Sequence, residues 1–177
     1  MRKIAALICA VVLSAACATG PTYQAAETSE FTQANYSAVD KLVAAPAVPI
    51  AKSAPVLVAT MVNIDSLNQS SRFGRLISEQ IATRLTQLGH GVVEMKLRND
   101  VYIREGTGEL LLSRDVRTLS KNHNVQVVVV GNYAVAAGYA YLTLKMVTVT
   151  DNRVVAAVNY LLPLTENNKA LLMQPRE

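Results

Sequence analysis

The stretch VQVVVVGNYAV, residues 125–135, constrains the fold more than any other part of the chain. Its consecutive valines favour an extended strand and leave neither face of that strand polar, so both faces must be covered. Such a strand belongs in the middle of a sheet. A second near-continuous apolar run, PVLVATMVNI (residues 55–64), also predicts a strand covered on both faces.

The segment between these two strands predicts a β-α-β unit. Residues 68–91, NQSSRFGRLISEQIATRLTQLGHG, place apolar side chains at helical spacing, with Gly89 and Gly91 as stop signals. The strand VVEMKL (residues 92–97) follows. Two strands joined through an amphipathic helix favour parallel pairing. The apolar positions of the helix are Phe73, Leu76, Ile77, Ile81, Leu85 and Leu88.

The later segments complete a mixed sheet. Residues 113–123, SRDVRTLSKNH, predict a shorter helix with Ser113 as its cap. After the valine-rich strand, Gly138 leads into residues 139–149, whose strict alternation predicts an antiparallel strand with one wetter face. A turn at 151–152 then leads into a last strand that ends at Pro163. We therefore predict a single α/β (α+β) domain of order β-α-β-α-β-β-β with helices packed on the sheet.

Segments outside this domain are expected to have simpler structure. Residues 31–44, FTQANYSAVDKLVA, have apolar residues at helical spacing and predict a short helix, ended by Pro46 and Pro49. The segment 165–177 is polar apart from a short ALLM, and we expect it to be loosely ordered.

The beginning of the chain, MRKIAALICAVVLSAAC, has the three parts of a secretory signal. Arg2 and Lys3 precede a short apolar run, and small residues at 14–16 follow it. The apolar run is too short for a comfortable transmembrane helix, and no later run reaches about 18 uninterrupted apolar residues. We expect the exported protein to be held at a membrane only by a lipid, or not at all.

The two cysteines favour the lipid. They are Cys9, inside the leader, and Cys17, directly after it, so removal of residues 1–16 leaves one unpaired thiol at the new N-terminus. The pattern resembles a bacterial lipoprotein signal, in which Cys17 carries a diacylglycerol, although the third position before it is Ser14. Ala18 favours outer-membrane sorting. The alternative is ordinary cleavage after SAA or ACA, which would leave a soluble periplasmic protein.

The expected organisation is a signal peptide at 1–16, a lipidated N-terminus and flexible tether at 17–30, the α/β domain at 31–164 and the tail at 165–177. Loss of Arg2 and Lys3 with the leader lowers the formal net charge of +4 to +2. The chain has no run of like charges and no basic residues interleaved with aromatic ones, so we expect no nucleic-acid partner.

The glycine-containing stretch YIREGTGELLLSRD, residues 102–115, is not a phosphate loop. Gly106 and Gly108 are separated by one residue rather than by the four of a Walker loop, no lysine follows them, and two carboxylates would repel a phosphate. We interpret the two glycines as a structural turn. Its charged residues, Arg104, Glu105 and Glu109, are candidate partner contacts, with a salt-bridged turn as the alternative.

Other chemistry has little support in the sequence. The mature chain has His90 and His123 but no metal-ligand spacing, no nucleophile elbow and no reactive cysteine, so we expect no catalytic residue, metal or cofactor. Gly74, early in the predicted helix, indicates close packing of that helix against the sheet. Arg72 and Arg75 beside it are further candidate partner contacts.

Four segments together resemble the FlgO family of flagellar outer-membrane lipoproteins. They are ANYSAVDKL, the run from VATMVNID to VVEMKLR, IREGTGELLLSRD and VVVVGNYAVA, and the resemblance covers about residues 31–164. The sheet is also similar to the N-terminal domain of TolB and to the sheet domain of CsgG. The resemblance implies a non-catalytic lipoprotein that supports motility. Its implied partners are the outer membrane, reached through the lipid anchor, and flagellar outer-membrane or basal-body proteins, with a homo-oligomer as a further possibility.

Two alternatives stay open from the sequence. The first is a general envelope assembly or secretion lipoprotein that is unrelated to flagella. The second is a periplasmic enzyme or small-ligand binder that uses Arg104, Glu105 and Glu109.

Overall fold

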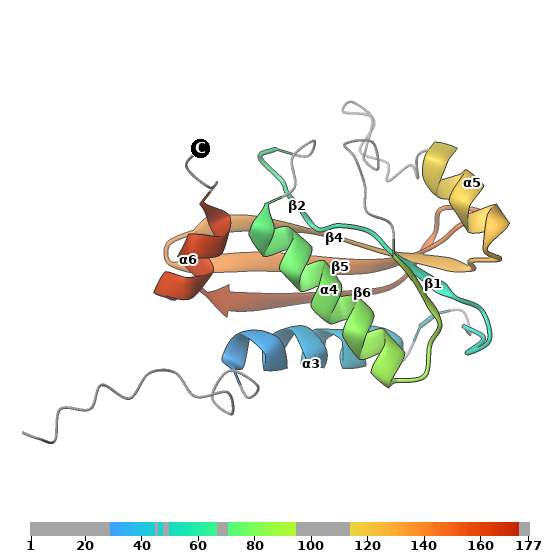
Figure 1. The fold of residues 1–177 in the computed structure, drawn as a ribbon, viewed down its shortest axis with the longest axis horizontal. Coiled ribbons are helices and arrows are strands. Elements are labelled where there is room, and N and C mark those ends of the chain that lie inside the picture. The colour runs from blue at the N-terminus through green and yellow to red at the C-terminus, as the bar shows by residue number, and fades with distance from the viewer. Residues whose placement is uncertain (1–28, 45, 48–49, 67–70, 95–113, 174–177) are drawn as a thin grey trace, which may run out of the picture.

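The computed structural model describes residues 29–44, 46–47, 50–66, 71–94 and 114–173 of the chain (Figure 1). Within these residues the elements follow the predicted order, with one strand divided in two and one helix added at the end. They are α3 (Glu30–Ala44), β1 (Val56–Val58), β2 (Val62–Asn63), α4 (Arg72–Gln87), β3 (Val92–Glu94), α5 (Arg114–Asn122), β4 (Val127–Ala136), β5 (Tyr139–Thr148), β6 (Val154–Pro163) and α6 (Glu166–Leu172).

The strands form one mixed sheet, as predicted. Its order is β3-β1-β4-β5-β6, and β2 also pairs with β4. β1 pairs in parallel with both β3 and β4, which confirms the β-α-β unit around α4. β4, β5 and β6 form the predicted antiparallel meander. A two-residue turn joins β4 to β5, and its residues Ala137 and Gly138 both have positive φ, as the favoured hairpin turns require.

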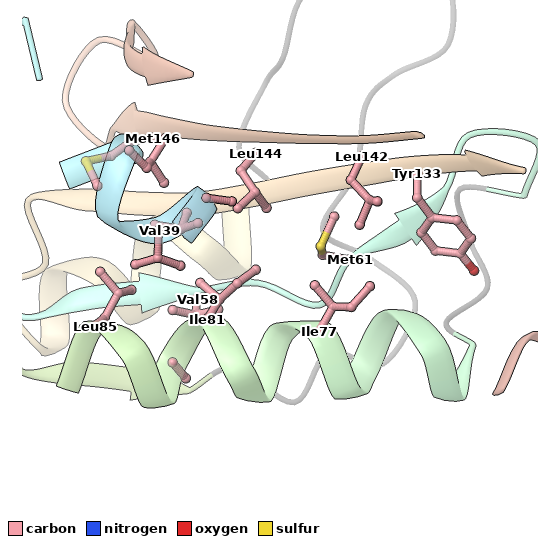
Figure 2. Close-up of a cluster of buried hydrophobic side chains, with 14 of the residues drawn as sticks. Val39, Val58, Met61, Ile77, Ile81, Leu85, Tyr133, Leu142, Leu144 and Met146 are labelled. Carbon is pink, nitrogen blue, oxygen red and sulfur yellow. The ribbon is translucent and has the colours of Figure 1, made fainter. Parts of the chain in front are cut away.

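Both faces of β4 are buried from Val127 to Val130, which confirms the prediction made from its valines. On one side, Val127 and Val129 belong to the larger core cluster, which α3 and α4 cover. On the other side, Val128 and Val130 belong to a smaller cluster, against which Leu119 of α5 packs. Figure 2 shows the larger cluster, in which Ile77, Ile81 and Leu85 of α4 point toward the sheet.

The predicted strand at 55–64 is interrupted, and α4 explains the interruption. The Ser78 hydroxyl accepts a hydrogen bond from the Met61 N–H at 2.8 Å and lies 3.3 Å from the Ala59 carbonyl oxygen. The Met61 N–H, which leaves the sheet ladder between β1 and β2, is thereby satisfied by the helix. Gly74 makes this approach possible, because a Cβ there would collide with the Met61 carbonyl oxygen. The close packing expected at Gly74 is confirmed.

The segment after β6 is not loosely ordered in the part that the structure describes, so that expectation was wrong. The Thr165 side chain caps α6 by accepting a hydrogen bond from the Asn168 N–H, and Asn168 donates from its side chain to the Pro163 carbonyl at 2.7 Å. Leu171 and Leu172 pack against the core. A cap and two apolar residues on one side are enough to order this polar segment. Helix α3, Glu30–Ala44, confirms the helix predicted for residues 31–44.

Gly74→Ala should lower the free energy of unfolding by about 1–3 kcal/mol, because the new methyl group overpacks a contact with backbone that cannot rotate away. Urea denaturation followed by circular dichroism measures the change. Thr83→Ala, at an exposed position of the same helix, is the control and should change stability by less than about 0.5 kcal/mol. Equal stability of Gly74→Ala and the wild type would contradict the close contact.

Candidate interaction surface

Several of the predicted functional residues lie outside the described part of the chain, so their roles stay predictions. Neither the lipidation site nor the glycine turn with its charged neighbours is described. These residues are Cys17, Arg104, Glu105, Gly106, Gly108 and Glu109.

Arg72 is described, and its guanidinium joins two helices. It is the first residue of α4, and its Nη2 donates to the carbonyl oxygens of Ala170 and Met173, at 2.6 and 2.8 Å. The last carbonyls of a helix lack partners within the helix, and a cation there also complements the helix dipole. Arg72 therefore holds the end of α6 against the start of α4, a structural role that the sequence did not reveal.

Arg75 shares a face of α4 with Arg72 and Leu76. Residues three and four apart on a helix are neighbours on its surface, and all three side chains are exposed. Leu76, which its spacing placed on the apolar face of the helix, is instead 37% exposed. The two arginines named from the sequence are thus brought together beside an apolar side chain, as a contact surface would require.

A second exposed apolar surface lies on the face of the sheet opposite α3 and α4. It consists of Tyr139 and Tyr141 of β5 and Leu161 of β6, and we call it the tyrosine strip. These side chains are 46%, 47% and 51% exposed. Tyr141 lies directly opposite Leu161, so the two side chains are cross-strand neighbours. In Figure 1, α5 lies at the other end of the sheet from the β4–β5 hairpin, next to which Tyr139 begins β5.

The tyrosine strip was not among the residues proposed from the sequence, although a signal for it was present. The alternation in residues 139–149 placed Tyr139 and Tyr141 on the wetter face of an antiparallel strand, and that prediction is confirmed. Exposed tyrosines combine a large apolar ring with a hydrogen-bonding hydroxyl, which makes them common in protein interfaces. Leu161 could not be placed beside them without the register of β5 and β6.

A buried polar network positions α3. The Asn35 amide donates to Gln80 Oε1 of α4 at 2.6 Å and accepts from the Tyr160 hydroxyl of β6, also at 2.6 Å. Gln80 in turn donates to Thr32 Oγ1. Asn35 is fully buried. Since buried polar groups are costly unless they are paired, this network selects one position of α3 relative to both α4 and β6.

Two tyrosine hydroxyls of the core are perturbed by burial. Desolvation raises the pKa of Tyr160 well above its usual value of 10.0. Burial also raises the pKa of Tyr133, and the hydrogen bond with Ser71 opposes that shift. The Tyr133 hydroxyl lies 2.6 Å from Ser71 Oγ, the N-cap of α4, and Figure 2 shows it at the end of the core where α4 begins. Both hydroxyls stay protonated at neutral pH, and the Tyr160 hydroxyl donates to Asn35.

Ionic contacts in the described residues are also structural. Arg84 of α4 binds Asp40 of α3 through two hydrogen bonds of 2.8 and 2.9 Å, and its guanidinium lies over the Tyr36 ring. In the ranges that the structure describes, no group of three or more His, Cys, Asp or Glu side chains is placed to hold a metal ion. The same ranges contain no helix long and apolar enough to cross a membrane.

Comparison with known proteins identifies the family. The family model described as FlgO protein matches residues 36–167. This chain belongs to the FlgO family. The match includes Gly74 and the tyrosine strip, and, of the polar network, Gln80 and Tyr160.

The fold is also similar to solved structures. The LpoB C-terminal domain from Salmonella enterica has 13% sequence identity and a TM-score of 0.54, and the comparison covers 76% of this chain and 99% of that one. The LpoB C-terminal domain from Escherichia coli has 12% identity and the same TM-score, with 76% and 98% covered. No curated protein sequence matches the chain. At these identities the likeness concerns the fold alone.

The variant Tyr160→Phe tests the polar network through the pH dependence of stability. The pKa of Tyr160 is higher in the folded than in the unfolded chain, so the unfolded chain loses this proton first as pH rises through about 10. Stability from this group is therefore complete below about pH 10 and decreases above it, by up to about 1.4 kcal/mol per pH unit.

The Tyr160→Phe variant should be less stable than the wild type at pH 7, by about 1 kcal/mol for the lost hydrogen bond. This gap should narrow between pH 10 and 11.5, as measured by urea unfolding at each pH. A gap that stays constant over that range would contradict the buried hydroxyl.

Proposed function

We propose that this FlgO-family protein is a non-catalytic outer-membrane lipoprotein that supports flagellar assembly or motility through protein contacts. The observation that carries the proposal is the family match over residues 36–167, most of the chain. The leader and Cys17 support the lipid anchor, and the outer membrane is the proposed location, with the domain facing the periplasm. The proposed partners are flagellar outer-membrane or basal-body proteins.

The described surfaces support a role in protein contacts. The tyrosine strip and the Arg72–Arg75–Leu76 face of α4 expose apolar side chains next to polar ones, which is the composition of a protein interface. Arg84, Tyr133 and Tyr160, whose pKa values are raised, are held in helix-to-helix or helix-to-strand contacts. Arg104, Glu105 and Glu109 are proposed as additional contacts of the same kind.

In the proposed organisation, the lipid on Cys17 anchors the chain and the residues between Cys17 and α3 give it reach. Because α3 begins at Glu30 and packs on α4 and β6, the folded domain starts immediately after this tether. The anchor then fixes the location of the domain, while the domain selects the partner. These two parts can be tested separately.

Cys17→Ser should abolish incorporation of radiolabelled palmitate and move the protein from the outer-membrane fraction to the soluble periplasmic fraction, because the sulfur is the proposed acylation site. The folded domain should be unaffected, as judged by resistance to protease. Cys9→Ser, within the leader, is the control and should keep both label and location. Palmitate labelling that persists in Cys17→Ser would overturn the proposed anchor.

Deletion of the gene should reduce the diameter of swimming zones in soft agar, and expression of the wild-type protein from a plasmid should restore it. Electron microscopy of the same cells shows whether flagella are missing or only inactive. Normal swimming with intact flagella would refute the flagellar role. If the same strain then showed an envelope defect, such as sensitivity to detergent, the general envelope role would replace it.

A further inference from the structure

Among the strands that the structure describes, β6 lies at one edge of the sheet and pairs with β5 alone. The hydrogen bond from the Leu164 N–H to the Gly138 carbonyl shows that even-numbered residues at this end bond toward β5. In an antiparallel pair the hydrogen-bonding direction alternates along the strand. The odd-numbered residues of β6 therefore direct their N–H and C=O groups away from the sheet. Consistently, the Val155 carbonyl accepts a hydrogen bond from outside it, from the Ala47 N–H at 2.7 Å.

Both ends of this outward row are occupied by the chain itself. Ala47 covers Val155 at one end. At the other end, the Pro163 carbonyl accepts from the Asn168 side chain at 2.7 Å and from the Thr165 N–H at 3.0 Å. The row between them contains three residues, Ala157, Asn159 and Leu161, which we call the open window. All three are exposed, and within the described part of the chain their outward backbone groups have no hydrogen-bond partner.

The open window lacks the devices that normally protect a sheet edge. Natural edge strands are blunted by charged side chains, prolines or bulges. Between Val154 and Pro163 the sequence VVAAVNYLLP contains no charged residue, and its proline stands at the end. The register shift near Met146 affects the Val155 end, which Ala47 already covers. Leaving the middle of such a strand open creates a ready template for another strand.

We propose that the open window binds an extended peptide segment of another protein, which adds to the sheet as a further strand beside β6. The window offers three N–H and three C=O groups that recur every two residues, about 7 Å apart. An extended polypeptide matches this repeat with its own backbone, in the way that strand addition works elsewhere. This inference rests on the proposed function, because strand addition is one way in which the protein could make the proposed contacts with its partners.

The side chains around the window define the chemistry of the segment. On the open face, Leu161 lies beside the exposed Tyr141, whereas Asn159 is polar and Ala157 is small. A matching segment therefore carries an apolar side chain next to Leu161 and uncharged residues at the alternating positions facing the same way. The segment has about five residues in contact, because the occupied ends allow no more.

A second copy of this chain does not fit the window through its own β6. Antiparallel pairing of two copies about Asn159 would bring the proline end of one β6 against Val155 of the other, where Ala47 already lies. The ten-residue β6 also continues into α6 through the capped turn at Thr165, so it cannot leave the sheet after five residues. A flexible segment of another protein can do so.

Peptides selected from a phage-displayed library of random twelve-residue sequences test the proposal on the full-length protein purified in detergent. Selected peptides should slow amide hydrogen exchange at Ala157, Asn159 and Leu161 by about tenfold or more, as expected for newly formed hydrogen bonds. Recovery of no binding peptide, or protection confined to other amides, would overturn it. Protection that rises with protein concentration in the absence of peptide would identify a second copy as the occupant, and would also overturn it.

Two variants at position 159 separate the contribution of the backbone to peptide binding from that of the side chain. Asn159→Pro removes an outward N–H and breaks no hydrogen bond within the chain, since proline is tolerated on such edge positions. It should weaken binding of a selected peptide by about tenfold, whereas Asn159→Ala keeps the N–H and should change it by less than about threefold. Circular dichroism and thermal melting verify that both variants fold. Equal affinity of the two variants would refute strand addition at this window.

The swimming assay distinguishes this proposal from the proposed function. If deletion abolishes swimming but Asn159→Pro and Asn159→Ala both restore it, the flagellar role stands and the window is not its contact. If deletion leaves swimming intact, the peptide measurements still decide whether the window binds an extended segment.

Discussion

The contact between α4 and the backbone that links β1 to β2 supports the rest of the structure. Gly74 has no side chain to separate the helix from Met61, and the Ser78 hydroxyl accepts a hydrogen bond from the Met61 N–H, which leaves the sheet at that point. A helix held at this distance determines where its other contacts lie. Gln80 meets Asn35 of α3, and Arg72 meets the end of α6. The positions of α3, α4 and α6 therefore all depend on this one close contact.

The position of α3 has a consequence at the edge of the sheet. Asn35 binds both α4 and Tyr160 of β6, so α3 lies along the last strand and the chain that follows it reaches Ala47, which bonds to Val155. The other end of β6 is covered by the capped turn into α6. Both the segment at Ala47 and the turn into α6 are placed there because α3 and α6 pack on the core. What they leave between them is a short, uncharged stretch of open edge, and its length restricts which partners can use it.

The proposed anchor and the proposed strand addition would act together. A few backbone hydrogen bonds yield only weak binding when both molecules diffuse freely, since each contributes little net free energy in water. A lipid on Cys17 would confine the domain near the outer membrane, and partners confined to the same region would meet it at a high effective concentration. Weak contacts at the open window, the tyrosine strip and the arginine face of α4 could then suffice.

Much of this fold followed from residue patterns. The valines of β4 required cover on both faces, the helical spacing from Phe73 to Leu88 required a helix between parallel strands, and the alternation from Tyr139 required an antiparallel strand with an exposed face. Gly74 even indicated a close helix-to-sheet contact. These are local properties, because period, branching and the lack of a side chain act on each segment by itself.

Other features depended on distant segments and were beyond the reach of such patterns. The break between β1 and β2 depends on Ser78, the order of α6 depends on its cap and on Arg72, and the burial of Asn35 depends on Gln80 and Tyr160. The candidate site divides in the same way: two tyrosines of the strip could be placed on an open face from their alternation, whereas Leu161 joined them only through strand register. The backbone groups of β6 that find no partner among the described residues have no sequence signature, because the elements that pack beside a strand determine which of its sides stays unpaired.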